Sequence, residues 1–333
     1  SEMCIRDRNT FVHFSFLNTA ASPAGIAVIH SLFNIGATIL LFPFANLLEK
    51  MAILAIPDKG SEVEEMEEEK INPDLARLDE RFLDKPGFAM EECRGVAINM
   101  ARKSKKAMNL AIDLLKEYDE KTSARVEKLE NQIDQYEDAL GTYLVKLSER
   151  DLSVKDSRIL SVLLHCIGDF ERISDHAVNI RDAAVEMNKK NLQFSDKAKQ
   201  ELLVFSNAIR DIIDRAVLAF ETGDTGLAKE VEPLEQVVDA LNKEEKQRHI
   251  NRLRTGTCTI ELGFVLSDIS TNFERAADHC SNIAVCLLQV DEGGFDTHEY
   301  LDILKEENSE EFRHEYMELS EKYTLPESKH GGK

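Results

Sequence analysis

Apolar residues recur at helical spacing along almost the whole chain between residues 88 and 290. In the segment 156–190 they form one continuous stripe, which consists of Ile159, Leu163, Ile167, Phe170, Ile173, Ala177, Ile180 and Ala184. Residues at these spacings share one face of a helix and bury that face against neighbouring helices. Pro233 is the only proline in this region, so residues that break helices are scarce. The pattern predicts an all-α protein.

The helical region contains an internal repeat. FERISDHAVNI at 170–180 returns as FERAADHCSNI at 273–283, and VEKLENQID at 126–134 returns as VEPLEQVVD at 231–239. The periodicity places three helical segments in each copy, at 88–118, 122–150 and 156–190, then at 196–222, 226–254 and 257–290. We therefore expect two tandem three-helix bundles, followed by a helical tail. Their predicted limits are 88–191 for the first repeat, 192–290 for the second and 291–333 for the tail.

A different pattern occupies the N-terminal part of the chain. No Asp, Glu, Lys or Arg occurs from Asn9 to Leu48. Pro23 suits the first turn of a helix, and residues 24–42 would span about 28 Å as a helix, close to the thickness of bilayer hydrocarbon. We expect a membrane-spanning helix within 9–56. The alternative is a buried helix of a soluble domain.

Two further segments stand apart from the helices. Residues 1–8, SEMCIRDR, bear no relation to the apolar chain that follows, and we interpret them as non-native. Residues 57–87 contain three prolines and the acidic run EVEEMEEEK at 62–70. Prolines and a run of like charges disfavour regular structure, so these residues are predicted to form an acidic linker.

Charge and cysteine content limit the function. The chain has 62 acidic and 41 basic residues, which gives a net charge of −21. A phosphate backbone requires a basic surface, so nucleic acid is excluded as a partner. The six cysteines form no C-x-x-C pair and no disulfide-framework spacing, which indicates a reducing compartment.

Each repeat contains two E-x-x-x-D elements, one on each of two helices. These are Glu130/Asp134, Glu171/Asp175, Glu235/Asp239 and Glu274/Asp278. A spacing of four places both carboxylates on one helix face, where like charges destabilise an isolated helix by a few tenths of a kcal/mol, about 0.2–0.5. A hard cation would offset this repulsion, because such cations prefer carboxylate oxygens.

The helical wheel places these acids at the edge of the core. Glu171 lies beside the apolar stripe, and Asp175 and Asn179 continue up the same flank. We expect the four carboxylates of each bundle to meet in one acidic groove, with Asn179 and its counterpart Asn282 as additional ligands. Solvated surface acids are the alternative, but their repetition at equivalent positions favours metal binding. His176 and His279 are further candidate ligands, but His176 lies on another face of its helix and is expected to contact another helix or the other bundle.

Enzymatic alternatives find little support in the residues. A ferritin-like di-iron site requires Glu-x-x-His on core helices, but this spacing occurs only as Glu311/His314 and Glu327/His330, in the tail. No Gly-rich phosphate loop, G-x-S-x-G element or Cys–His pairing indicates catalysis elsewhere. We predict that the chain is not an enzyme.

Several stretches resemble known families. ERISDHAVNI and ERAADHCSNI, each preceded by a helix with E-x-x-x-D, resemble the PhoU domain, whose fold is two three-helix bundles. IAVIHSLFNIGATILLFPF at 26–44 resembles the last membrane segment of bacterial sodium/phosphate cotransporters. LDERFLDKPGFAM at 78–90 is similar to the join between that membrane part and a C-terminal PhoU-like domain. The tail at 297–325 resembles the end of those cotransporters.

The resemblance carries expectations about ligands, partners and location. It implies that the eight carboxylates bind a divalent or multinuclear metal, with Mg, Mn, Fe and Zn as candidates. It implies a regulatory module of a sodium-dependent phosphate transporter, held at the inner membrane, with residues 57–333 in the cytoplasm. Phosphate, sodium, the membrane and the rest of the transporter are the implied partners, and a homodimer is the assembly to test.

The chain departs from the cotransporter family in one respect. The family's other membrane helices and its paired Gly/Ser/Gln-rich elements are absent from the sequence, so the chain by itself is not expected to transport phosphate. Two alternatives stay open: a free-standing PhoU regulator of phosphate uptake and signalling, and a helical adaptor without metal.

Overall fold

The computed structural model describes residues 31, 33–36, 38, 72–292 and 310–326. The chain divides into two units, residues 1–68 and residues 69–333. In the first unit only a few helical positions around Phe33 and Asn34 are described. The helical repeats belong to the second unit.

The first repeat folds into three long antiparallel helices joined by short connections. They are α4 (Pro86–Leu114), α5 (Glu120–Ser148) and α6 (Val154–Lys189). Pro86 occupies the first turn of α4, where its missing N–H is not needed. The Asp119 carboxylate accepts the backbone N–H of Thr122 at 2.8 Å, and the Ser153 hydroxyl accepts that of Asp156 at 3.1 Å. These N-caps define where α5 and α6 begin.

The second repeat contains three long helices and one short helix. They are α7 (Asp196–Thr222), α8 (Thr225–Lys229), α9 (Val231–Arg254) and α10 (Ile260–Glu292). The sequence predicted one helix over 226–254, whereas the structure divides this segment between α8 and α9. Pro233 is the third residue of α9, and a proline is accepted in a first turn but not inside a helix. The helix is therefore interrupted just before it.

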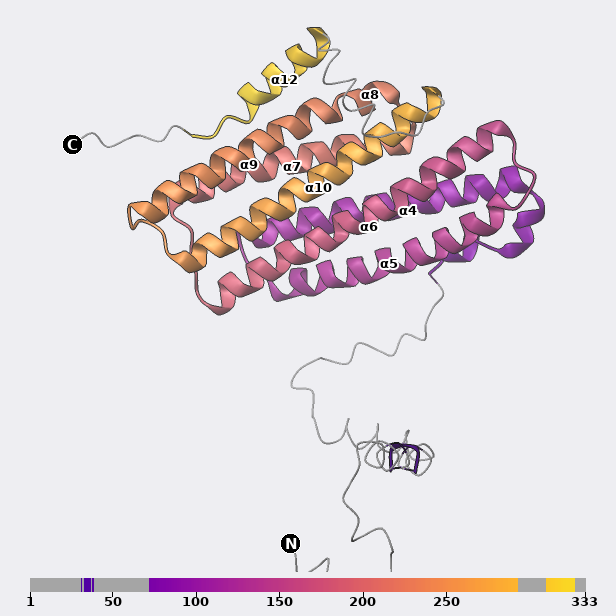
Figure 1. The fold of residues 1–333 in the computed structure, drawn as a ribbon, viewed down its shortest axis with the longest axis horizontal. Helices are drawn as coiled ribbons and strands as arrows, with labels where there is room; N and C mark the ends of the chain where they lie inside the picture. Colours follow the sequence, from indigo (N-terminus) through magenta and orange to yellow (C-terminus); the bar gives the residue numbers. More distant parts are fainter. Residues whose placement is uncertain (1–30, 32, 37, 39–71, 293–309, 327–333) are drawn as a thin grey trace, which may run out of the picture. The chain divides into compact units, whose positions relative to one another are not determined.

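The two bundles pack through their third helices, α6 and α10, and through α7 (Figure 1). The repeated phenylalanine Phe170 packs edge-to-face on Phe220 of α7, with ring centroids 4.9 Å apart. Its counterpart Phe273 packs in the same way on Phe205 of α7, at 5.2 Å. Edge-to-face pairs add stabilisation beyond the burial of their area. Most of the predicted stripe is buried, from Leu163 to Ala184, and the prediction of an all-helical fold is confirmed.

A C-terminal helix, α12 (Glu310–Lys322), packs on the second bundle. Its Glu315 pairs with Arg215 of α7 at 3.0 Å, and Lys322 pairs with Asp211 at 2.9 Å. Leu319 is buried in the same contact. Apolar burial and two ion pairs thus join the tail to α7 and α9.

The membrane helix predicted within 9–56 concerns the N-terminal segment of the chain. Residues 24–42 lie mostly outside the described residues. In the part of the chain that the structure does describe, no helix is both long and apolar enough to cross a bilayer, since a crossing needs about 20 apolar residues.

Candidate metal centre

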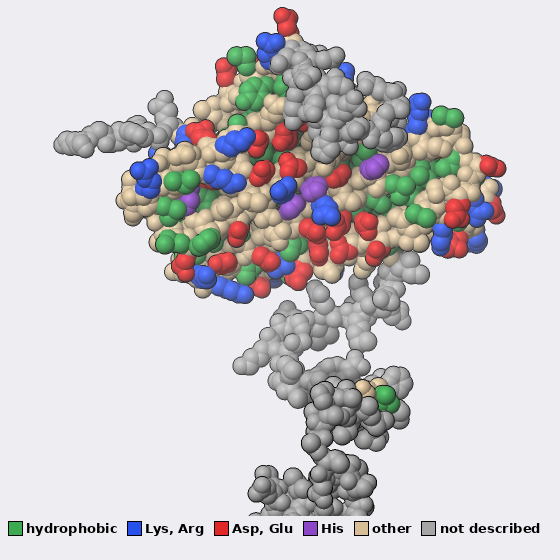
Figure 2. All heavy atoms as spheres, in the orientation of Figure 1, with side chains coloured by type: hydrophobic (Ala, Val, Ile, Leu, Met, Phe, Trp, Pro, Cys, Tyr) green, Lys and Arg blue, Asp and Glu red, His purple; other side chains and the backbone are tan. Residues whose placement is uncertain are grey.

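Three of the predicted ligands meet between α5 and α6. Glu130 and Asp134 lie one turn apart on α5, and Asp175 faces them from α6. Each offers an oxygen atom, and these three atoms lie within 4.8 Å of one another. Glu171 lies one turn before Asp175 on α6. Figure 2 shows a group of acidic side chains near the middle of this face of the molecule.

Burial and mutual repulsion change the titration of these acids. The pKa of Glu171 is raised to about 7, mainly by burial and then by the neighbouring charge of Asp175. The pKa values of Glu130 and Asp134 are also raised, by burial first and by nearby carboxylates second. A cation at this position would relieve the repulsion, because opposite charge favours the ionised form.

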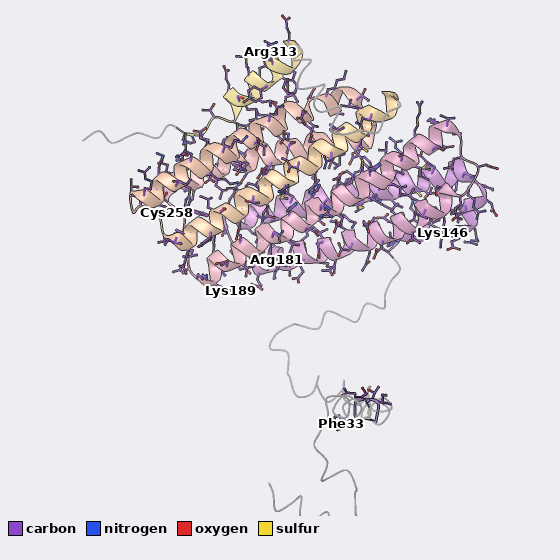
Figure 3. The ribbon with its side chains drawn as sticks, viewed as in Figure 1. Phe33, Lys146, Arg181, Lys189, Cys258 and Arg313 are labelled. Atoms are coloured by element: carbon purple, nitrogen blue, oxygen red, sulfur yellow. The ribbon has the colours of Figure 1, made fainter. Side chains whose placement is uncertain are left out.

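No Lys or Arg of the described residues forms an ion pair with Glu130, Asp134, Glu171 or Asp175. The charge of Arg172 opposes the rise in the pKa of Glu171, and that of Arg181 opposes the rise in the pKa of Glu130. Arg181 is labelled in Figure 3. It lies 3.5 Å from Glu127 and 3.1 Å from Asp182. Within the described residues these four carboxylates therefore have no direct ion-pair partner, although the charges of Arg172 and Arg181 partly offset their repulsion.

The equivalent acids of the second repeat have protein counterions instead. Lys243 Nζ lies 2.6 Å from Asp239, and Lys246 Nζ lies 3.9 Å from Glu274. Glu274 also accepts a hydrogen bond from the Asn242 amide at 2.9 Å, and Arg275 lies 3.6 Å from Asp278. Glu235 lines a cleft of about 310 Å³ that Asp278 and Asn282 share. In this bundle the four carboxylates form no comparable group of ligand atoms within the described residues.

This difference between the repeats is visible in the sequence but was not predicted. Where α9 carries Asn242, Lys243 and Lys246, the aligned positions of α5 carry Glu137, Asp138 and Gly141. The first repeat thus adds two acids to its groove, whereas the second adds two lysines. Extending the alignment two turns beyond the repeated stretch would have revealed this difference.

The two predicted asparagine ligands lie at the boundary between the bundles. Asn179 Nδ2 donates to Asn272 Oδ1 of α10 at 3.0 Å. Asn282 Nδ2 lies 3.5 Å from Asp169 Oδ1 of α6. Both amide groups are therefore engaged with the other bundle and not with the carboxylates.

The repeated histidines also meet at this boundary. His176 Nδ1 donates to Asn272 Oδ1 at 2.8 Å, and His279 Nδ1 donates to Asp169 Oδ1 at 2.8 Å. The two imidazoles stack with centroids 5.6 Å apart. The prediction that His176 contacts another helix or the other bundle is confirmed.

A family model for the PhoU domain matches residues 97–184 and 202–287, more than half of the chain. The chain belongs to the PhoU domain family. The two matched ranges lie on the two repeats, so the family model matches once in each bundle. The PhoU resemblance predicted from the repeated stretches is confirmed.

Other PhoU proteins are similar over most of their length. The phosphate-specific transport system accessory protein PhoU homolog 1 of Thermotoga maritima is 23% identical over 188 residues, which cover 56% of this chain and 80% of that protein. The PhoU homolog of Pseudomonas aeruginosa is 23% identical over 219 residues, which cover 66% of this chain and 90% of that protein. By name these relatives are accessory proteins, and on this finding the predicted location at the inner membrane is corrected and not retained.

Solved PhoU structures share the fold. The crystal structure of PhoU from Pseudomonas aeruginosa superimposes with a TM-score of 0.58 at 22% identity and covers 61% of this chain and 97% of that chain. The crystal structure of the phosphate transport system regulatory protein PhoU from Streptococcus pneumoniae gives a TM-score of 0.57 at 17% identity. It covers 63% of this chain and 99% of that chain. The two-bundle PhoU arrangement therefore spans the whole length of those proteins.

Proposed function

We propose that this PhoU protein is a non-enzymatic accessory regulator of phosphate uptake that binds a divalent metal between α5 and α6. The observation that carries the proposal is the group of Glu130, Asp134 and Asp175, whose ligand oxygens lie within 4.8 Å of one another. The names of the relatives support the regulatory part, since they are accessory proteins of a phosphate-specific transport system.

The chemistry of the donors suits a hard cation. All three groups are carboxylates, and Glu171 lies within one turn of Asp175 on the same helix. Oxygen donors favour Mg²⁺ or Mn²⁺, whereas structural Zn²⁺ is usually held by Cys and His. Glu137 and Asp138 continue the acidic surface along α5 and could support a second ion. Among the predicted metals, Mg²⁺ and Mn²⁺ are therefore tested first.

The two repeats are proposed to differ in metal affinity. In the second repeat Lys243 and Lys246 already neutralise Asp239 and Glu274. A metal there must displace an ammonium group, whereas no ammonium group of the described residues pairs with the acids of the first repeat. We expect the first repeat to bind more tightly, with the second occupied only at higher metal concentration.

A bound metal would supply a positive centre on an otherwise acidic surface. Phosphate oxygens are ligands for hard cations, so phosphate would complete the coordination sphere and report its own concentration to the uptake system. The alternative of a free-standing PhoU regulator is thus the function that we propose. We do not carry over the cotransporter assignment, because the relatives are accessory proteins by name.

The decisive experiment is elemental analysis of the purified full chain after loading with Mg²⁺ or Mn²⁺ and removal of free metal. We expect a stoichiometric ion that is lost in the Asp134→Asn/Asp175→Asn variant. The Asp239→Asn/Asp278→Asn variant is the matched control and should retain it. A chain that takes up no metal would favour the metal-free adaptor instead.

Two further measurements test the regulatory part. Calorimetric titration with phosphate should show binding by the metal-loaded chain and none after chelation. In a bacterium that lacks its own PhoU homologue, expression of the chain should change phosphate uptake, and the Asp134→Asn/Asp175→Asn variant should not. An unchanged uptake rate with the wild-type chain would contradict the proposal.

The homodimer stays a prediction that analytical ultracentrifugation can test.

A further inference from the structure

A cleft of about 430 Å³ opens where α4 and α6 end and α7 begins. It shares no residue with the ten predicted metal ligands. Nine of its sixteen lining residues are apolar, and none of these sixteen described residues is acidic. In a chain with 62 acidic residues of 333, about three acids would be expected among sixteen residues if composition alone decided. The volume lies within the range typical of small-molecule sites.

The turn after α6 builds one wall of the cleft. The backbone N–H of Leu192 donates to the carbonyl of Met187 at 2.8 Å, and that of Asn191 donates to Asn188 at 3.2 Å. This is a Schellman motif, which requires a left-handed residue after the helix, and Asn191 has φ 50°. The chain reverses here, so that Leu192 and the buried ring of Phe194 line the cleft.

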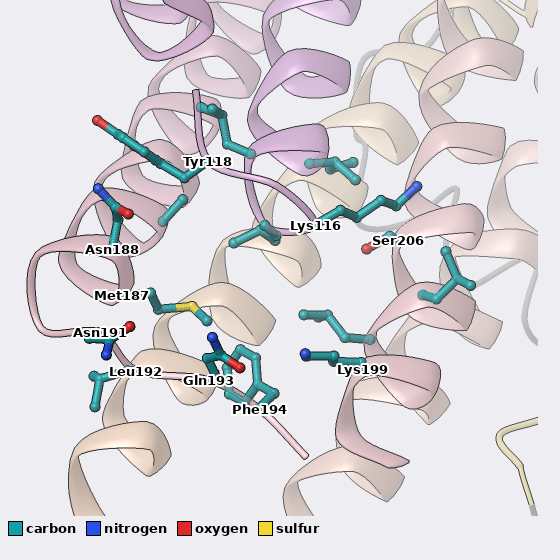
Figure 4. Close-up of a pocket in the computed structure, with 16 residues that line it drawn as sticks. Lys116, Tyr118, Met187, Asn188, Asn191, Leu192, Gln193, Phe194, Lys199 and Ser206 are labelled. Atoms are coloured by element: carbon teal, nitrogen blue, oxygen red, sulfur yellow. The ribbon is translucent and has the colours of Figure 1, made fainter. Parts of the chain in front are cut away.

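Three hydrogen-bond donors face the cleft without partners among the described residues. Ser206 is only 3% exposed, yet its hydroxyl makes no hydrogen bond in this part of the chain. Lys116 and Lys199 line the cleft and form no ion pair there. In the view of Figure 4, Lys116 lies above Ser206 and Lys199 lies below it.

Nearby cations behave differently. Arg210 pairs with Asp113 at 2.7 Å, and Lys190 pairs with Glu186 at 2.8 Å. The two lysines of the cleft are thus left as free positive charges at the edge of an apolar floor. The Ser206 hydroxyl is not among the fully buried polar atoms without a partner. It opens into the cleft, where a ligand oxygen can accept its hydrogen bond.

We propose that this cleft binds a small organic anion, with its apolar body on Met187, Phe194 and Leu202 and its oxyanion headgroup between Lys116 and Lys199. The hydroxyl of Ser206 donates a hydrogen bond to the headgroup. Carboxylates and phosphate monoesters share this chemistry. The site is independent of the metal-binding proposal, because its donors are cationic and its ligand is organic.

Isothermal titration calorimetry of the full chain tests the site with octyl phosphate and octanoate, both below their micelle-forming concentrations. We expect one equivalent to bind. The Lys116→Ala/Lys199→Ala variant should weaken binding by at least about tenfold, which corresponds to the loss of about 1.4 kcal/mol. The matched control is Lys106→Ala/Lys197→Ala, which removes two exposed lysines of α4 and α7 that do not line the cleft. Its affinity should equal that of the wild type.

Recognition of the ligand's apolar body and recognition of its anionic headgroup are tested separately. Leu203 lines the cleft and is 43% exposed, so Leu203→Trp should fold normally and block the apolar floor. 1-Octanol carries only the apolar body of the ligand, and inorganic phosphate carries only its headgroup. Each should bind at least tenfold more weakly than octyl phosphate. Tighter binding of octyl phosphate than of octanoate would assign a phosphate monoester, and the reverse order would assign a carboxylate.

Three results would overturn the proposal. One is equal affinity of the wild type and the Lys116→Ala/Lys199→Ala variant for both anions. Another is binding that Leu203→Trp leaves unchanged. The third is equal binding of 1-octanol or inorganic phosphate, because the site would then recognise only one half of the ligand.

Discussion

His176 of α6 and His279 of α10 stack across the boundary between the bundles, with ring planes inclined at 26°. Each donates from Nδ1 to a side chain of the opposite helix, His279 to Asp169 and His176 to Asn272, both at 2.8 Å. The acceptors are separated by 103 residues, as are the histidines. The contact therefore has local two-fold symmetry, except that one acceptor is a carboxylate and the other an amide.

The acceptor oxygen of Asp169 is expected to matter more than its charge. Asp169→Asn keeps an oxygen for His279, as in the contact of Asn272 with His176, and should change the free energy of unfolding by less than about 1 kcal/mol. Asp169→Leu leaves the donors of His279 and Asn282 unpaired in a largely buried contact. It should lower the free energy of unfolding by about 1–3 kcal/mol. Urea denaturation measures both variants, and equal losses would show that charge dominates.

The pKa of His176 should lie below its ordinary value of 6.5, because burial disfavours the imidazolium and His279 lies beside it. Asn272 and Asp175 act in the opposite direction, but burial is the largest cause. Since the folded state binds the proton less readily than the unfolded state, this histidine contributes stability above pH 6.5 that is lost as the pH falls.

An NMR titration of the His176 ring resonance tests that direction. Asn272→Asp places a carboxylate beside the imidazole, as at His279, and should raise the pKa of His176 above that of the wild type. A pKa at or above 6.5 in the wild type would contradict the prediction.

Glu245 should make the second bundle less stable at alkaline pH. It is 2% exposed, and burial raises its pKa from 4.5 to about 7, despite a hydrogen bond from Ser270 and the charge of Arg252. The folded state therefore holds a proton that the unfolded state has released, and stability falls as the pH rises from 4.5 to about 7.

Glu245→Gln removes that titration. At pH 8 the variant should be more stable than the wild type by about 1–3 kcal/mol, and at pH 4.5 the two should be similar. Thermal unfolding at both pH values measures the difference. Glu117→Gln, at an exposed position on the α4–α5 connection, is the control and should show no such pH-dependent gain.

Gly263 of α10 is required by the close approach of His249 of α9. A Cβ at this position would lie 2.6 Å from His249 Nε2, and His249 is only 8% exposed. Gly263→Ala should therefore destabilise the chain by about 1–3 kcal/mol, in spite of the better helix propensity of Ala. Gly168→Ala on α6, where a Cβ meets nothing within 4 Å, should instead stabilise it by about 0.5–1 kcal/mol. Adding His249→Ala should remove most of the penalty of Gly263→Ala.

The lysines of the second repeat are expected to act as its counterions. Lys243→Ala/Lys246→Ala leaves Asp239 and Glu274 without their ammonium partners. A second equivalent of Mn²⁺ should then bind with an affinity close to that of the first repeat. Lys155→Ala/Lys229→Ala, which removes the same charge elsewhere, is the control, and an equal gain in both variants would refute a local effect. Calorimetric titration with Mn²⁺ gives both affinities.

The prediction of helices and of a duplicated bundle needed only local information. The stripe from Leu163 to Ala184 follows the 3.6-residue period, and the period alone decides which face is buried. The spacing of four in Glu130/Asp134 likewise places both carboxylates on one face without any knowledge of the neighbours. Because the sequence repeats, the same local features were predicted for the second bundle.

The outcome at the candidate site depended on contacts between distant segments. Asp175 lies near Glu130 only because α6 packs on α5 with one particular rotation about its own axis. Asp239 is neutralised because Lys243 follows one turn later on α9. Asn179, predicted as a ligand, turns instead to Asn272 of the other bundle. The sequence by itself determined the helices, the duplication and the carboxylate spacing, because these depend on neighbours along one helix. Only the tertiary structure decided which acids share a site, which are paired, and where the cleft beside Ser206 lies, because helix rotation and packing bring together side chains that are far apart in the chain.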